Sequence, residues 1–173
     1  MKNKKVIFWT KGIDALIKDE NKFNGGAAVQ MLFWAKTFCK NNWKVYTFSE
    51  KQKFSIDDII FFKFPSFSKI GILLEIFFTI YFFLKINPDV IIRRGASRNL
   101  FFTALFSKIF CKKLIFMAAH DTDFDTGNEI INYRYNKRLY KWGLHMTNRF
   151  VTQNHNQSQN LEKNYKKIKY LLI

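Results

Sequence analysis

The chain has 173 residues, of which 48% are hydrophobic and 21 are phenylalanine. This composition fits one globular domain of ordinary size and excludes global disorder. The 29 Lys and Arg residues outnumber the 13 Asp and Glu residues, so the formal net charge is +16. Such an excess favours an anionic partner, of which nucleic acid, an acidic membrane surface and a phosphorylated substrate are the three classes.

The cysteines and the N-terminus together indicate the cellular compartment. Cys39 and Cys111 each lie in an apolar helical context, which predicts buried thiols and no disulfide framework. The apolar run 6–9 that follows the basic N-terminus is too short for the apolar region of a signal peptide. We therefore expect a reducing compartment, the cytoplasm, with peripheral contact at the inner face of the cell membrane as a further option.

Six short apolar runs bounded by polar residues are typical of strands that are buried on both faces. They are 6–9, 45–48, 59–62, 90–92, 114–117 and 150–152. Between most of them lie segments with helical spacing of apolar residues, and Ser97 is a candidate N-cap for the run 100–110. This alternation predicts a single α/β domain over residues 1–173, with a doubly wound, mostly parallel sheet and helices on both faces.

The segment 70–86 is apolar enough to suggest membrane contact. Its 17 residues are marginal for a transmembrane helix, and Glu75 near its middle would be costly at the centre of a bilayer. We favour a packed or interfacial helix, because a Phe-rich face beside Lys69 and Lys85 suits contact with anionic lipid.

Gly25 and Gly26 stand where a helix is predicted to begin. Paired glycines let backbone N–H groups approach an anion at the positive end of a helix dipole, although the same pair can be a flexible turn. No G-x-G-x-x-G pattern is present, so NAD binding is not expected.

His120, Asp121 and Asp123 directly follow a predicted strand. This group could coordinate a metal, bind sugar hydroxyls or tune the histidine as a base, or it could be a polar loop that caps the next helix. The spacing does not fit an EF-hand, and ligands for a zinc site are lacking.

Arg94 ends another predicted strand and could present its guanidinium to a phosphate or carboxylate. On its own, a surface charge is the simpler interpretation. The basic residues of the last 41 positions are typical of a solvated helix face, and no nucleic-acid-binding motif accompanies them. We therefore expect no nucleic-acid partner.

Taken in order, these segments resemble the N-terminal, acceptor-side domain of a GT-B glycosyltransferase of the family-4 (group 1) type. The resemblance covers essentially the whole chain. It is carried by residues 25–30, 32, 35–36 and 45–47, by 88–92 with Arg94, by 118–123, and by 150–153 with Gln157.

The resemblance implies a Rossmann-like half of a retaining enzyme that moves a sugar from a nucleotide-sugar donor to a lipid-linked or polysaccharide acceptor. It implies that His120 contacts the transferred sugar and that the glycine pair approaches the donor diphosphate. It places Arg94, Asp121, Asp123 and Gln153 on the acceptor side. No cofactor and no resident metal ion are implied.

The family continues with a second, donor-binding domain that is missing from this sequence. We therefore expect the chain alone to lack sugar-transfer activity and a separate C-terminal half to be a candidate partner. Two alternatives stay open. Asp121 and Asp123 could form the metal-binding D-x-D of a GT-A glycosyltransferase, or the chain could be a non-catalytic basic module that binds a membrane or a partner chain.

Overall fold

The computed structural model describes residues 4–10, 13, 25–49, 54–56, 58–63, 72–97, 99–125, 134–165 and 170–172. The chain divides into two compact units, Met1–Ile91 and Ile92–Ile173. We describe each unit by itself. The expectation of a single domain over the whole chain stays a prediction.

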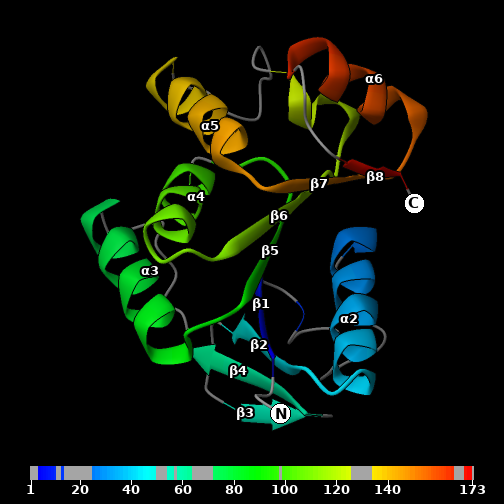
Figure 1. Ribbon diagram of the computed structural model, residues 1–173. Helices are drawn as coiled ribbons and strands as arrows, with labels where there is room; N and C mark the ends of the chain where they lie inside the picture. The colour runs from blue at the N-terminus through cyan, green and yellow to red at the C-terminus, as the bar shows by residue number, and fades with distance from the viewer. Residues whose placement is uncertain are drawn as a thin grey trace. The chain divides into compact units, whose positions relative to one another are not determined.

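The first unit contains four strands in the order β3-β4-β2-β1 (Figure 1). Strands β1 (Lys5–Trp9), β2 (Lys44–Ser49) and β4 (Ile59–Lys63) are parallel, with Val6 opposite Val45 and Val45 opposite Ile59. Strand β3 (Phe54–Ile56) pairs antiparallel with β4. The apolar runs 6–9, 45–48 and 59–62 correctly predicted the parallel strands, whereas three residues were too few to reveal β3.

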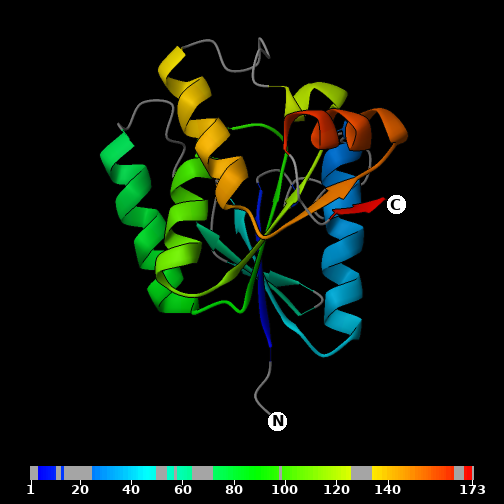
Figure 2. The same cartoon turned by 45° about the horizontal axis from the view of Figure 1, so that its top comes forward.

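Two helices cover this unit on opposite sides of its strands, α2 (Gly25–Lys40) and α3 (Ile72–Ile86) (Figures 1 and 2). Helix α3 buries Phe82 and Phe83, which are each 2% exposed. The Phe82 ring packs 4.9 Å from that of Phe48, and the Phe83 ring 6.0 Å from that of Trp9. These aromatic contacts attach the helix to β1 and β2.

Helix α3 is the segment for which membrane contact was considered. Among the described residues, no helix is both long enough and apolar enough to cross a bilayer. The structure does not describe Lys69 or the side chain of Glu75, on which part of that expectation depended.

The second unit contains strands in the order β5-β6-β7-β8, and β5 begins two residues before it. Their bounds are Val90–Arg94, Lys113–Met117, Arg149–Thr152 and Tyr170–Leu172. The pairs β6–β7 and β7–β8 are parallel.

Helices α4 (Leu100–Ile109) and α5 (Arg134–Met146) lie on one side of these strands, and α6 (His155–Asn164) lies on the other (Figure 2). A short 3₁₀ turn, η1 (Asp121–Phe124), contacts α6. The core is aromatic. The Phe116 ring lies 5.9 to 6.3 Å from the rings of Phe124, Phe150 and Tyr140.

Each unit therefore has mostly parallel strands with helices on both faces, and the predicted Rossmann-like α/β class is confirmed. Two local predictions are wrong. Asn99 is the N-cap of α4, and Ser97 Oγ accepts a hydrogen bond from the Asn99 N–H at 3.3 Å. Cys39 is half-buried and Cys111 is exposed, because Cys111 follows α4 in a left-handed turn with φ 53°.

Helices α4 and α5 approach closely at Gly143. A Cβ atom there would lie 2.8 Å from the Phe101 backbone nitrogen and 2.9 Å from Leu100 Cγ. Alanine favours a helix intrinsically, but this overlap with backbone forces the two helices apart. We expect Gly143→Ala to lower the free energy of unfolding by about 1 to 3 kcal/mol, measured by urea denaturation.

Gly26→Ala is the matched control in the other unit. A Cβ atom at Gly26 would meet nothing within 4 Å, so we expect this variant to be neutral or slightly stabilising. Equal stability of Gly143→Ala and the parent would contradict the close packing of α4 on α5.

Candidate functional site

Three predicted site residues come from three neighbouring strands of the second unit. Arg94 ends β5, His120 follows β6 by three residues, and Gln153 directly follows β7. Because β5, β6 and β7 are neighbours in the sheet order, their carboxyl ends bring these residues to one edge. This is the edge at which open α/β sheets bind their ligands.

Gly95 directly follows β5 and bonds to the last residue of β6. Gly95 has φ +75°, a left-handed conformation that glycine adopts without strain, and its N–H donates to the Met117 carbonyl at 3.0 Å. Arg94 Nη2 donates to Gln153 Oε1 at 3.2 Å. The structure thus joins two residues that lie 59 positions apart in the sequence.

Arg94 and Gln153 are both partly exposed, although the Nε atom of Arg94 is buried. Burial lowers the pKa of the Arg94 guanidinium below its ordinary value, and the charge of Asp123 acts in the opposite direction. Arginine stays protonated in proteins at neutral pH. The edge therefore carries a fixed cation with planar donors, which suits phosphate or carboxylate oxygens.

Asp123 is fully buried and holds the turn after β6 in place. Its Oδ2 accepts hydrogen bonds from the backbone N–H groups of Ala119 at 2.6 Å and His120 at 3.2 Å. The hydroxyl of Tyr140, on α5, donates to the Asp123 carbonyl at 2.6 Å. Asp123 thus positions His120, which is exposed. The predicted place of Asp123 on the acceptor side stays a prediction.

Three asparagines attach the η1 turn to α6. Asn154 Nδ2 donates to Asp121 Oδ1 at 2.9 Å, and Asn160 Nδ2 donates to the Asp121 carbonyl at 3.0 Å. Asn164 Nδ2 donates to the Phe124 carbonyl at 3.1 Å. The sequence analysis did not predict a role for these asparagines, because the bonds span 33 to 40 residues.

Asp121 and Asp123 have different environments. Asp121 is exposed and bonded to α6, whereas Asp123 is buried with Oδ2 bound to its own backbone. No group of three or more His, Cys, Asp or Glu side chains that could hold a metal ion occurs within the described ranges. The geometry gives no support to the D-x-D alternative, which requires two accessible carboxylates at one ion.

The remaining predicted site residues, Gly25 and Gly26, lie in the first unit. Helix α2 begins at Gly25, so the pair occupies the positive end of the helix dipole as predicted. Gly26 is exposed, with open space where a Cβ atom would be. This is suitable for close approach of an anion, and a role in donor binding stays a prediction.

No protein-family model and no curated protein sequence matches the chain. Solved structures do match it. Sucrose-phosphate synthase from Thermosynechococcus elongatus is 9% identical, with a TM-score of 0.66 over 99% of this chain and 48% of that one. A UDP-N-acetylglucosamine 2-epimerase is 14% identical, with a TM-score of 0.66 and the same two coverages.

A third structure, S. aureus MnaA with UDP, is 10% identical, with a TM-score of 0.65 over 98% of this chain and 43% of that one. At these identities the likeness establishes the fold alone. The chain spans about half the length of these proteins. It has the α/β fold of one half of a GT-B-like enzyme.

The two aspartates of the turn are expected to differ in their effect on stability. Asp123→Ala leaves two backbone N–H groups without their acceptor, which costs about 2 kcal/mol of unfolding free energy. Asp121→Ala removes one exposed bond and is expected to cost less than about 1 kcal/mol. Urea denaturation of both variants measures the difference, and equal losses would contradict the role given to Asp123.

Two buried tyrosines predict a loss of stability in alkali. Burial raises the pKa of Tyr140 well above its ordinary value, with Asp123 acting in the same direction, and burial also raises the pKa of Tyr165. Above about pH 10 the unfolded tyrosines lose protons that the folded ones keep, so stability falls as pH rises. The double variant Tyr140→Phe with Tyr165→Phe should show a shallower fall in thermal denaturation between pH 9 and 11; an unchanged slope would contradict this cause.

Proposed function

We propose that the chain is the N-terminal half of a retaining GT-B glycosyltransferase of the family-4 (group 1) type. In this proposal the complete enzyme transfers a sugar from a nucleotide-sugar donor to a lipid-linked or polysaccharide acceptor at the inner face of the cell membrane. The GT-B-like fold and the ordered sequence resemblance support it.

The observation that carries the proposal is the hydrogen bond between Arg94 and Gln153 beside the His120 turn. Gln153 Oε1 holds the guanidinium at the ligand-binding edge, and a charged guanidinium suits an anionic glycan or phosphate group. His120 stands on a turn fixed from two sides, by Tyr140 and by α6. Such a preorganised side chain can contact a sugar without rearrangement of the loop.

The proposed roles follow this geometry. His120 contacts the transferred sugar, and Arg94, Gln153 and Asp121 bind the acceptor. Gly25 and Gly26 supply backbone donors to the donor diphosphate, whose charge grows as it departs. A second half, continuous with this chain or separate from it, holds the nucleotide, so we expect no turnover from these 173 residues alone.

Ligand-observed NMR tests this site with a panel of sugar phosphates and UDP-sugars. We expect millimolar or tighter binding of at least one sugar phosphate by the parent chain. Arg94→Ala should weaken it at least about tenfold, because a charge-assisted hydrogen bond contributes about 1.5 to 3 kcal/mol.

Arg149→Ala is the matched control. Arg149 lies at the other end of β7, where its Nη1 donates to the Asn148 carbonyl at 2.9 Å. The control removes the same charge from the same unit and should leave binding unchanged. Absence of binding across the panel, or an equal loss in the two variants, would contradict the proposed function.

A further inference from the structure

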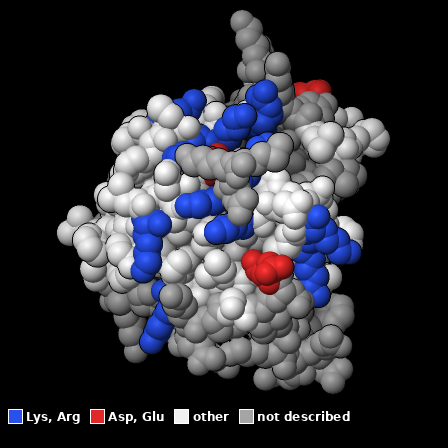
Figure 3. All heavy atoms as spheres, turned by 60° about the horizontal axis from the view of Figure 1, so that its bottom comes forward, with Lys and Arg blue, Asp and Glu red and all other residues white. Residues whose placement is uncertain are grey.

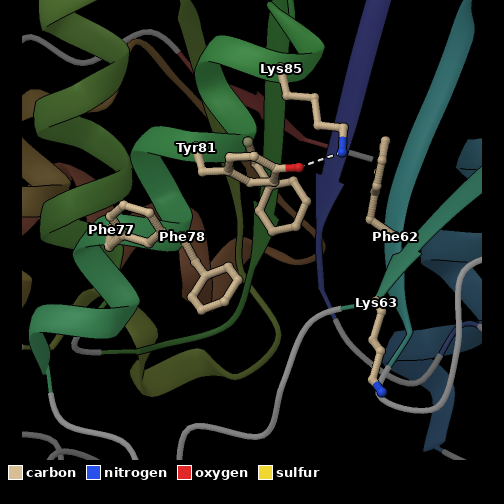
Figure 4. A pocket seen from close by; sticks show the side chains of 7 residues that line it. Phe62, Lys63, Phe77, Phe78, Tyr81 and Lys85 are labelled. Atoms are coloured by element: carbon tan, nitrogen blue, oxygen red, sulfur yellow. Dashed lines mark hydrogen bonds between the residues drawn. The ribbon is translucent and has the colours of Figure 1, made fainter.

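An aromatic pocket lies between β4 and α3 in the first unit, apart from the residues proposed for sugar transfer. Its volume is about 380 Å³. Figure 4 shows the rings of α3 on one side and Phe62 with Lys63 of β4 on the other. Five aromatic side chains and two lysines line it: Phe62, Lys63, Phe77, Phe78, Tyr81, Phe82 and Lys85.

The pocket opens beside an exposed apolar stripe on α3. Leu73, Phe77 and Leu84 are 77%, 62% and 64% exposed, and Tyr81 belongs to the same stripe. These positions recur at intervals of three and four residues, so they share one helix face. The opposite face carries the buried Phe82 and Ile86. Large side chains gathered on one exposed face are typical of a surface that contacts an apolar partner.

Lys85 stands over the aromatic lining of this pocket. Its ammonium lies 5.3 Å from the centroid of the Phe62 ring and 4.8 Å from that of Tyr81, and it donates to the Tyr81 hydroxyl (Figure 4). An ammonium has three N–H donors, so this bond leaves capacity for an anionic oxygen. The rings hold the cation at the pocket.

The surroundings are basic. Within the described part of the first unit, seven lysines outnumber three acidic residues, Asp58, Glu75 and Asp89. Figure 3 shows one face of the molecule on which Lys and Arg side chains are spread among uncharged residues and acidic ones appear in few places. An apolar stripe with cations beside it complements a surface that presents phosphates above hydrocarbon.

We propose that this face of α3 and β4 docks on an anionic lipid membrane, with a lipid chain in the aromatic pocket and lipid phosphates at Lys63 and Lys85. Leu73, Phe77 and Leu84 enter the interfacial region, while the long lysine side chains keep their charges at headgroup level. Tyr81 fits the same level, because its ring is apolar and its hydroxyl polar. The proposal is independent of the sugar chemistry proposed above.

Cosedimentation of the full 173-residue chain with lipid vesicles tests this surface. We expect binding to vesicles of phosphatidylcholine with phosphatidylglycerol and little binding to phosphatidylcholine alone. The double variant Lys63→Gln with Lys85→Gln should weaken binding about tenfold, since a basic residue near an anionic surface contributes on the order of 1 kcal/mol. Phe77→Ser and Leu84→Ser, each made singly, should weaken it by a similar factor.

The first unit offers matched controls on α2. Lys36→Gln with Lys40→Gln removes the same charge, and Phe33→Ser alters a ring that is 70% exposed. Both should bind as the parent does, and circular dichroism confirms that every variant is folded. Equal loss in the controls, equal binding to neutral vesicles, or no binding would overturn the proposal. So would a parent dimer that Phe77→Ser converts to a monomer, because the face would then join two copies of the chain.

Discussion

The constraint on which the structure depends is the burial of short apolar strands on both faces. Strands such as β1 and β6 have almost no exposed residues, so helices must cover them on either side. In the second unit helices connect the strands, and the carboxyl ends of the parallel strands meet at one edge. The location of Arg94, His120 and Gln153 at one edge is a consequence of this arrangement.

At that edge, the polar residues divide into those that build the turn and those that remain accessible. Asp123 is buried and satisfies backbone donors of its own loop, and α6 holds Asp121 through asparagine side chains. His120 is left exposed on a turn that these hydrogen bonds attach to α5 and α6. Rigid support beneath an accessible side chain is what a binding or catalytic site requires.

Helix α3 has apolar side chains on both its buried and its exposed face. One face supplies Phe82, Phe83 and Ile86 to the core, and the other exposes large apolar side chains. A helix that served the core alone would carry polar residues on its outer face. The same helix therefore contributes to the interior of the first unit and to an exposed apolar surface.

The sequence by itself determined the class of fold and most of its elements. Apolar runs and helical spacing depend on residues close together in the chain, so they revealed the parallel strands, helices α2 to α4 and the position of Gly25 at a helix start. Strand β3 was not predicted because three residues carry too little pattern. The N-cap was assigned to Ser97 instead of Asn99 because both residues are polar and lie close to the start of the helix.

Only the tertiary structure decided what the polar residues do. Sequence reasoning named Arg94, His120 and Gln153, but their proximity depends on the order of β5, β6 and β7. It treated Asp121 and Asp123 alike, whereas burial separates them, and it missed Tyr140 and the asparagines of α6. The physical reason is that hydrogen bonds between residues 17 to 59 positions apart leave no local pattern in the chain.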